Sequence, residues 1–251
     1  MKIIILAAGK GERLMPLTKN TPKPLLDMGD GTTLLENQIE RLKESGVVNE
    51  VVLVIGYLAD QIEAKIRMHN DNGFKIRTIF NPLYEVSNNL VSLWAAKHEM
   101  QNDFMITNGD NLFTPDVFSG LAANVNEGVY VSVSHKQDFD EDDMKVTLQN
   151  NMITSISKKI PIDLSDAESP GLALIRGERM CRIFREHLDL SLKVQGSIQT
   201  YWLEVFNCLH RSGIPIRPWF FNSSDRWLEV DFHMDVSTVR ELLSLKKNNM
   251  I

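Results

Sequence analysis

Four short apolar segments in the first 110 residues, separated by segments of helical periodicity, constrain the fold most strongly. Residues 2–8 form an apolar run that ends at Gly9, which is typical of a strand buried on both faces of a parallel sheet. The same alternation continues with strand patterns at 50–55, 75–80 and 104–107 and helix patterns at 32–44, 59–68 and 88–99. Parallel strands need long crossover connections, so this alternation predicts βαβ units and an α/β fold.

The second half of the chain differs, because strand candidates follow one another without helices between them. Asn150 and Asn151 separate the strand patterns at 144–149 and 153–157, which predicts a hairpin. Further patterns predict strands at 128–134, 216–221 and 227–230 and helices at 178–188, 198–209 and 237–245. We therefore expect one domain over residues 1–251. Its sheet is mostly parallel in residues 1–110 and gains an antiparallel, mixed extension in residues 111–251.

The composition excludes several classes of protein. The 33 acidic and 27 basic residues give a net charge of -6, which argues against nucleic-acid binding. Two cysteines cannot form a disulfide framework, and both are expected in the core of a protein from a reducing compartment. The apolar start ends at charged residues 10–13 instead of a signal-peptide cleavage site, and no apolar stretch reaches the length of a membrane span. The sequence predicts a cytoplasmic protein without a membrane segment.

The loop after the first strand carries the strongest chemical signal. Gly9 and Gly11 let the backbone approach a phosphate closely, and exposed N–H groups there form an anion-binding nest. Arg13 can donate to two phosphate oxygens, while Lys10 and Lys23 add positive charge. In an open α/β sheet, ligands bind outside the carboxyl ends of the strands, where this loop falls. These residues alone leave open the alternative of a surface loop with incidental charges.

Two familiar phosphate-binding motifs are absent from this loop. Leu14 stands where the dinucleotide fingerprint needs its third glycine, and the chain has no P-loop string. Residues 6–26 (LAAGKGERLMPLTKNTPKPLL) instead resemble the signature loop of the nucleotidyltransferases, which couple a nucleoside triphosphate to a sugar phosphate or a similar acceptor. The resemblance extends in order over nearly all of the chain and implies a Rossmann-like sheet flanked by helices.

The resemblance also implies roles for individual residues. Arg13, Lys23 and Lys158 match catalytic positions, and Asp110 and Asp231 match the aspartates that bind Mg²⁺. The nucleotide is expected to contact Leu6, Ala7, Ala8, Gly9, Lys10, Gly11, Asn81, Asn88 and Gly109. An acceptor oxygen then attacks the α-phosphorus, and pyrophosphate leaves. Because the second pKa of a phosphomonoester is about 6, the acceptor is already ionised near neutral pH and needs no strong general base.

Three segments favour one branch of the family. Residues 81–90, 142–146 and 156–159 resemble the cytidylyltransferases that act on phosphocholine and on phosphonates. We therefore expect CTP and a small phosphate or phosphonate as substrates, with Lys145 and Lys158 as acceptor ligands. Lys159 would face away from Lys158 on a strand, so only one of the two is expected to point into the site.

Some features keep two interpretations. The acidic run 138–143 is explained by a solvated loop or by attraction of a cationic acceptor head, with Asp143 as the best candidate. Asp231, His233 and Asp235 would share one face of a strand, but the resemblance needs only Asp231, and Asp235 suits the N-cap of the last helix.

The function keeps two alternatives as well. One is a sugar 1-phosphate nucleotidyltransferase that uses UTP or dTTP, and the other is a regulatory domain that binds a nucleotide without turnover. The oligomeric state also stays open, with a homodimer through the late helices as one option.

Overall fold

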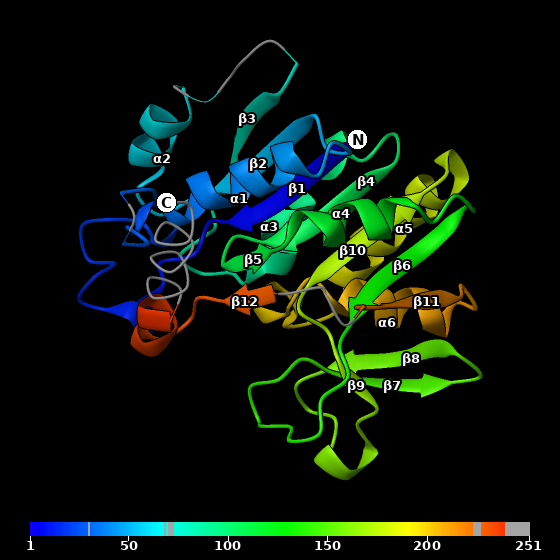
Figure 1. The fold of residues 1–251 in the computed structure, drawn as a ribbon. Coiled ribbons are helices and arrows are strands. Elements are labelled where there is room, and N and C mark those ends of the chain that lie inside the picture. Colours follow the sequence, from blue (N-terminus) through cyan, green and yellow to red (C-terminus); the bar gives the residue numbers. More distant parts are fainter. Residues whose placement is uncertain (30, 68, 70–72, 223–226, 239–251) are drawn as a thin grey trace.

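The computed structural model describes residues 1–29, 31–67, 69, 73–222 and 227–238. Its α-helices are α1 (Leu34–Glu44), α2 (Ala59–Ile66), α3 (Asn89–Ala95), α4 (Pro115–Ala122), α5 (Glu178–Leu192) and α6 (Glu204–Arg211) (Figure 1). Its strands are β1 (Lys2–Ala7), β2 (Glu50–Ile55), β3 (Lys75–Phe80), β4 (Phe104–Asn108), β5 (Asn111–Phe113), β6 (Gly128–Val133), β7 (Lys145–Gln149), β8 (Met152–Ser157), β9 (Ala167–Glu168), β10 (Leu172–Arg176), β11 (Ile216–Phe220) and β12 (Trp227–Glu229).

A long mixed sheet organises the described part of the chain, with the strand order β3-β2-β1-β4-β10-β6-β11-β8-β7-β9. The first four of these strands are mutually parallel. β10 is antiparallel to both β4 and β6, and β11 returns parallel to β6. The predicted fold class is therefore confirmed, including its antiparallel extension.

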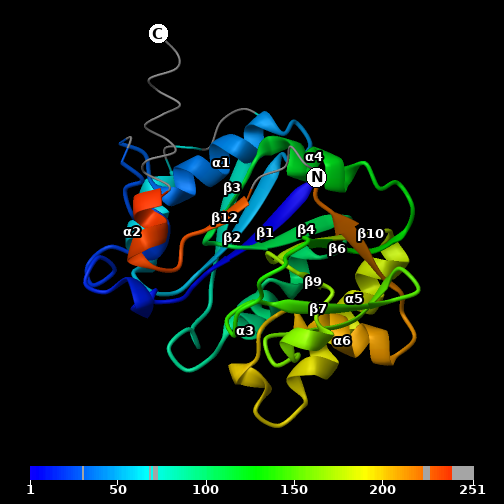
Figure 2. The same cartoon turned by 60° about the horizontal axis from the view of Figure 1, so that its bottom comes forward.

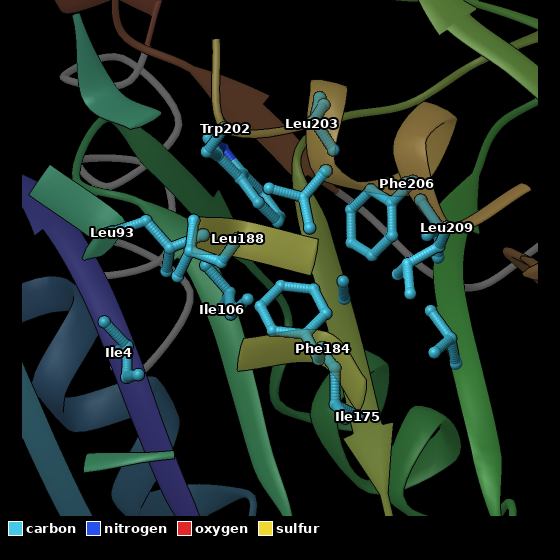
Figure 3. Close-up of a cluster of buried hydrophobic side chains, with 14 of the residues drawn as sticks. Ile4, Leu93, Ile106, Ile175, Phe184, Leu188, Trp202, Leu203, Phe206 and Leu209 are labelled. Carbon is cyan, nitrogen blue, oxygen red and sulfur yellow. The ribbon is translucent and has the colours of Figure 1, made fainter. Parts of the chain in front are cut away.

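The alternation of side chains along each strand explains why both faces of the sheet are covered. Ile4 points into a cluster with α3, α5 and α6, whereas Ile3 points into a cluster with α1, α2 and α4. Two views of the fold show these helices on opposite sides of the sheet (Figures 1 and 2). On the first face, Phe184 of α5 and Trp202 both pack against Phe206 of α6, with ring centroids 5.9 and 5.5 Å away (Figure 3).

Most predicted elements occur within one or two residues of their expected bounds. Thr33 begins α1 with a capping box, because its side chain accepts from the Glu36 amide while Glu36 accepts from the Thr33 amide. Asn150 and Asn151 have φ values of 51° and 59°, as a tight hairpin turn between β7 and β8 requires. Among the described residues, none of the helices combines the length and apolar character that crossing a bilayer demands.

Several elements differ from the predicted ones, and one prediction lies largely outside the described residues. β10 and α4 were not predicted, although β10 lies in the centre of the sheet. The helix expected at 198–209 starts only at Glu204, after a separate short turn at Ser197–Gln199. β12 pairs with β5 in a small second sheet instead of extending the large one. The helix expected at 237–245 falls largely outside the described residues, but the chain is already helical at 233–238.

Candidate active site

A cavity of about 810 Å³ opens beyond the carboxyl ends of β1 and β4. The cavity wall includes most of the residues that the sequence singled out: Leu6, Ala7, Ala8, Gly9, Lys10, Gly11, Arg13, Lys23, Asn88, Gly109, Asp110, Lys158 and Asp231. These residues come from segments that are more than 200 positions apart in the chain. The fold therefore brings the predicted nucleotide, metal and acceptor residues around one cavity.

Two glycines shape the floor of the cavity. Gly11 has φ +64°, and a Cβ there would lie 3.2 Å from Lys23 Cβ, so glycine is required for the loop to pack against Lys23. A Cβ at Gly109 would lie only 2.7 Å from Ala7 Cβ, and the Gly109 amide donates to the Leu6 carbonyl over 2.8 Å. This close approach places Asp110 directly beside the glycine loop.

Three carboxylates meet at the side of the cavity. The antiparallel pair β12–β5 sets Glu229 opposite Asn111, and the Val230 amide donates to the Asp110 carbonyl over 3.0 Å. Oxygen atoms of Asp110, Glu229 and Asp231 consequently lie within 4.8 Å of one another. Such a set of oxygen donors is what Mg²⁺ prefers in proteins.

Lys23 neutralises part of this charge. Its Nζ donates to Asp110 Oδ2 over 2.9 Å and to Asp231 Oδ1 over 2.7 Å. Burial alone would raise the pKa of Asp231, but Lys23 and Arg13 hold that pKa below its ordinary value. Burial and the two neighbouring aspartates raise the pKa of Glu229 to about 8. Asp110 Oδ1 is buried and has no hydrogen-bond partner in the described part of the chain. The cluster therefore keeps an unsatisfied acceptor oxygen and disfavours ionisation of its third carboxyl group.

Basic residues from both halves of the chain meet at an acidic turn. Arg13 Nη1 donates to Asp231 Oδ2 and to Asp142 Oδ2, each over 2.7 Å. Lys158 Nζ donates to Asp142 Oδ1 over 2.7 Å and lies 5.2 Å from the centroid of the Tyr201 ring. Lys159 is exposed and is not part of the cavity wall. Of the two lysines, Lys158 is the one in the cavity wall, although both lie in the turn after β8 and not on the strand.

A second group of charges lines the cavity near this turn. Lys136 Nζ lies 2.7 Å from Asp143 Oδ1 and 3.2 Å from Glu168 Oε2. The pKa of Glu168 is raised, mainly by burial, although Lys136 opposes the shift. One cation thus faces two carboxylates here, so the group carries surplus negative charge or holds a proton.

Two predicted ligands lie outside the cavity wall. The prediction that Lys145 binds the acceptor is wrong, because its side chain is buried and its Nζ donates to the carbonyl oxygens of Asp140 (2.9 Å), Glu141 (3.4 Å) and Asp143 (3.3 Å). Asn81 is also buried, since its amide donates to Ser92 Oγ over 3.0 Å and its oxygen accepts from the Leu83 amide. It supports the loop beside the cavity instead of facing a ligand.

The histidine and the last aspartate of the late segment are not brought to the carboxylate cluster. His233 Nε2 lies 2.9 Å from the Met15 carbonyl oxygen. Asp235 lies inside the helix at 233–238, not at its N-cap, and its Oδ2 accepts from the amides of Asp231 and Phe232. This contact is one half of a capping box and fixes the backbone of Asp231.

Sequence reasoning missed Glu229, Asp142 and Glu168. The signal for Glu229 was present, because residues 229 and 231 share a face of any strand that contains both. The sequence pattern of Asp142 is that of a solvated acidic run, and only the tertiary structure shows that it reaches Arg13. Glu168 belongs to the two-residue strand β9, which has no periodicity to detect.

Comparisons with known proteins agree with this geometry. Residues 2–141 match the family model described as nucleotidyl transferase. The chain is 34% identical over 176 residues to choline-phosphate cytidylyltransferase of Streptococcus pneumoniae, which covers 68% of this chain and 71% of that protein. It is also 27% identical over 249 residues to the bifunctional protein GlmU of Methanocaldococcus jannaschii, covering 94% of this chain and 56% of that relative.

A solved structure of the CTP:phosphocholine cytidylyltransferase from Streptococcus pneumoniae has the same fold. The TM-score is 0.75 at 24% identity, over 96% of this chain and 98% of that one. The chain therefore belongs to the nucleotidyl transferase family, and its resemblance to the cytidylyltransferase branch is confirmed.

Proposed function

We propose that this nucleotidyltransferase transfers CMP from CTP to a small phosphate or phosphonate acceptor and releases pyrophosphate. The observation that carries the proposal is the arrangement of Arg13, Lys23 and Lys158 around one cavity with a carboxylate cluster. An acceptor oxygen forms the new bond to the α-phosphorus, and the bond from that phosphorus to pyrophosphate breaks. The chain brings two anions together and stabilises the charge that develops, so positioning and electrostatics account for the catalysis.

The basic residues divide this work between them. Arg13 has a planar fork that suits triphosphate oxygens, and Lys23 lies at the junction between the glycine loop and the carboxylates. Lys158 comes from the turn after β8, meets Arg13 at Asp142, and would hold the acceptor phosphate or phosphonate. We found no need for a general base, because the acceptor is already ionised near neutral pH. The division into a nucleotide-binding half (1–110) and an acceptor-binding half (111–251) follows the same assignment.

We propose Mg²⁺ as the cofactor, held by Asp110, Asp231 and Glu229. The buried, unpartnered oxygen of Asp110 and the close approach of three carboxyl groups, which raises the pKa of Glu229, support this assignment. When bound, Mg²⁺ would neutralise phosphate charge and orient the triphosphate. Lys23 contacts two of the same carboxylates, so it must share them with the ion or move toward a phosphate.

The acceptor is proposed to carry an amino head group. Asp143 and Glu168 face the cavity near Lys158 and supply negative charge for a cation, while Lys136 balances only one of them. Tyr201 is the aromatic ring that contacts Lys158, and the Trp202 ring is buried with its indole N–H donating to Asn108 Oδ1 over 2.9 Å. Carboxylates that accept hydrogen bonds favour an ammonium with N–H groups over a fully methylated one.

The direct test is pyrophosphate release with Mg²⁺, crossing CTP, UTP, dTTP and ATP with phosphocholine, phosphoethanolamine, 2-aminoethylphosphonate and glucose 1-phosphate. We expect release with CTP and a small amino phosphate or phosphonate. Glu168→Gln should raise the KM for 2-aminoethylphosphonate about tenfold with little change in the KM for CTP. Full Mg²⁺-dependent turnover by Asp110→Ala would contradict the proposed metal site.

A second candidate is transfer to a sugar 1-phosphate with UTP or dTTP. The similarity to GlmU favours it, because that match extends over 94% of this chain. Release of pyrophosphate with UTP or dTTP and glucose 1-phosphate, and none with CTP, would establish this alternative over the cytidylyl proposal. Triphosphate binding without pyrophosphate release from any of the acceptors would instead indicate a binding domain without turnover.

A further inference from the structure

Asp142 links the glycine loop to the acceptor side of the cavity. Its Oδ2 accepts from Arg13 Nη1 over 2.7 Å, and its Oδ1 accepts from Lys158 Nζ over 2.7 Å and from Arg13 Nη2 over 3.3 Å. Both oxygens of one carboxylate are thus engaged by the two cations assigned to different substrates. Carboxylate and phosphate oxygens accept hydrogen bonds from the same donors. A phosphate that takes the donors now facing Asp142 therefore competes with an Asp142 oxygen.

The turn that carries Asp142 is built to hold it there. Asp140 Oδ1 accepts from the Asp142 amide over 2.8 Å and from the Asp143 amide over 3.0 Å. Asp143 Oδ2 accepts from the Asp140 amide over 2.8 Å. Beneath the turn, the buried ammonium of Lys145 donates to three of its carbonyl oxygens. Residues 140–143 are therefore an ordered turn and not merely a solvated acidic run.

We propose that Asp142 is a positioning residue that couples the two substrate sites by releasing Arg13 and Lys158 in turn. The proposal rests on the proposed function, because it assigns Arg13 to the triphosphate and Lys158 to the acceptor. When the triphosphate takes Arg13, Asp142 keeps only its contact with Lys158. A single ion pair between partly exposed groups contributes little, and the exposed fractions of the Lys158 and Asp142 side chains are 25% and 45%. That single contact must then offset alone the entropy lost in ordering the Asp142 and Lys158 side chains, so the second substrate displaces it more easily and each substrate strengthens the binding of the other.

The coupling is measurable with a triphosphate that cannot be transferred. Calorimetry measures the affinity of the wild-type protein for α,β-methylene CTP in the presence of Mg²⁺. We expect a saturating acceptor, either 2-aminoethylphosphonate or phosphocholine, whichever is turned over, to raise this affinity about fivefold. That value is at the low end of known couplings. Asp142→Asn should bind α,β-methylene CTP several-fold more tightly than wild type when no acceptor is present. Addition of the acceptor should then change the affinity of Asp142→Asn for α,β-methylene CTP by less than twofold.

The matched control is Glu141→Gln, which removes the same charge one position away. The Glu141 side chain is exposed and does not line the cavity, so this variant should retain the wild-type coupling. Steady-state kinetics add a second readout, in which Asp142→Asn lowers the KM for CTP at low acceptor concentration.

Three results would overturn the proposal. One is wild-type coupling in Asp142→Asn, and another is equal loss of coupling in Glu141→Gln, which would reveal a general charge effect. The third is a raised acceptor KM with unchanged affinity for α,β-methylene CTP alone, which would make Asp142 an acceptor ligand. Inorganic tripolyphosphate separates this proposal from the proposed function. Tighter binding of that anion by Asp142→Asn than by Glu141→Gln would show that Asp142 competes with an anion for Arg13 and Lys158 even if no pyrophosphate release is found.

Discussion

Two clusters of charged side chains in this protein contain similar residues and serve different ends. At the end of the sheet opposite the cavity, Glu99 accepts from Lys2 Nζ over 2.7 Å and from Arg77 Nη1 and Nη2 over 2.8 and 2.7 Å. Arg77 also donates to Glu50 over 2.6 Å. Two cations match two carboxylates, and these partners hold the pKa of Glu99 at about 2.

The cavity cluster is not balanced in this way. Of the three carboxylates Asp110, Glu229 and Asp231, Lys23 donates to the two aspartates, and Arg13 lies at the edge of the group. One buried oxygen has no partner among the described residues, and one carboxyl has its pKa raised to about 8. The comparison teaches that buried charge alone does not identify a site. Incomplete pairing and a strongly raised carboxyl pKa identify it, because a structural cluster would be selected to satisfy every group.

The largest effect on activity is expected from a substitution in the cavity cluster. Asp110→Ala should lower kcat on the order of 10³-fold, as loss of one electrostatic group from a catalytic site does. Its stability should change by less than about 1 kcal/mol, because the substitution also removes a buried acceptor without a partner. Pyrophosphate release and urea unfolding measure the two quantities. A loss of stability as large as the loss of transition-state stabilisation would mean that the cluster is structural.

The converse substitution breaks the balanced cluster. Glu99→Gln should lower the free energy of unfolding by about 2 kcal/mol, because Lys2 and Arg77 lose a charged acceptor. The activity should stay within about twofold of wild type. Glu50→Gln is the matched control and should cost less than about 1 kcal/mol, because Glu50 is more exposed. A loss of turnover in Glu99→Gln at temperatures where it is folded would remove the distinction between the clusters.

The pH dependence of stability sharpens the same comparison. The pKa values of Glu99 and Glu36 are lowered from 4.5 to about 2 in the folded protein. A lowered carboxyl pKa stabilises the fold fully above the unfolded pKa, and this contribution is lost as the pH falls from 4.5 toward 2. We expect the urea midpoint of wild type to fall over that window. The difference in urea midpoint between wild type and Glu99→Gln should shrink over the same pH window. A difference that does not depend on pH would contradict the conclusion that the lowered pKa of Glu99 stabilises the fold.

The smallest effect is the response to Mg²⁺. At ten times its dissociation constant, an ion that binds only the folded state adds about 1.4 kcal/mol to stability. Thermal unfolding of wild type and Glu99→Gln should shift upward by a few degrees with Mg²⁺. Asp231→Asn should show no shift. Equal shifts in all three proteins would place the ion elsewhere.

The sequence predicts the parallel half of the fold well, because buried parallel strands and amphipathic helices have strong local patterns. β2 and β3 have the predicted bounds, and the glycine loop lies where the strand pattern places it. β10 escaped prediction because its pairing with β4 and β6 joins segments far apart in the chain. The strand is short, and nothing in its five residues indicates which strands it pairs with.

The site residues also fall into those that the sequence could predict and those that it could not. Residues in the contiguous loop 6–26, such as Arg13 and Lys23, were accessible to pattern and resemblance. Lys145 was misjudged because a lysine in an acidic run is normally solvated, whereas here three carbonyl oxygens of one turn satisfy its buried ammonium. Asp142 depends on the tertiary structure alone, since its partners lie 129 and 16 positions away in the chain.

The central place of β10 also affects how the chain is synthesised. The four parallel strands β1 to β4 are complete once residue 108 has left the ribosome, but the free edge of β4 is then an apolar strand with unpaired backbone groups. Its partner is translated only at residues 172–176. A nascent chain between these lengths has an edge open to aggregation, and that edge is a natural target for a chaperone. The central strand β10, which joins the two halves of the sheet, is thus translated long after the four parallel strands.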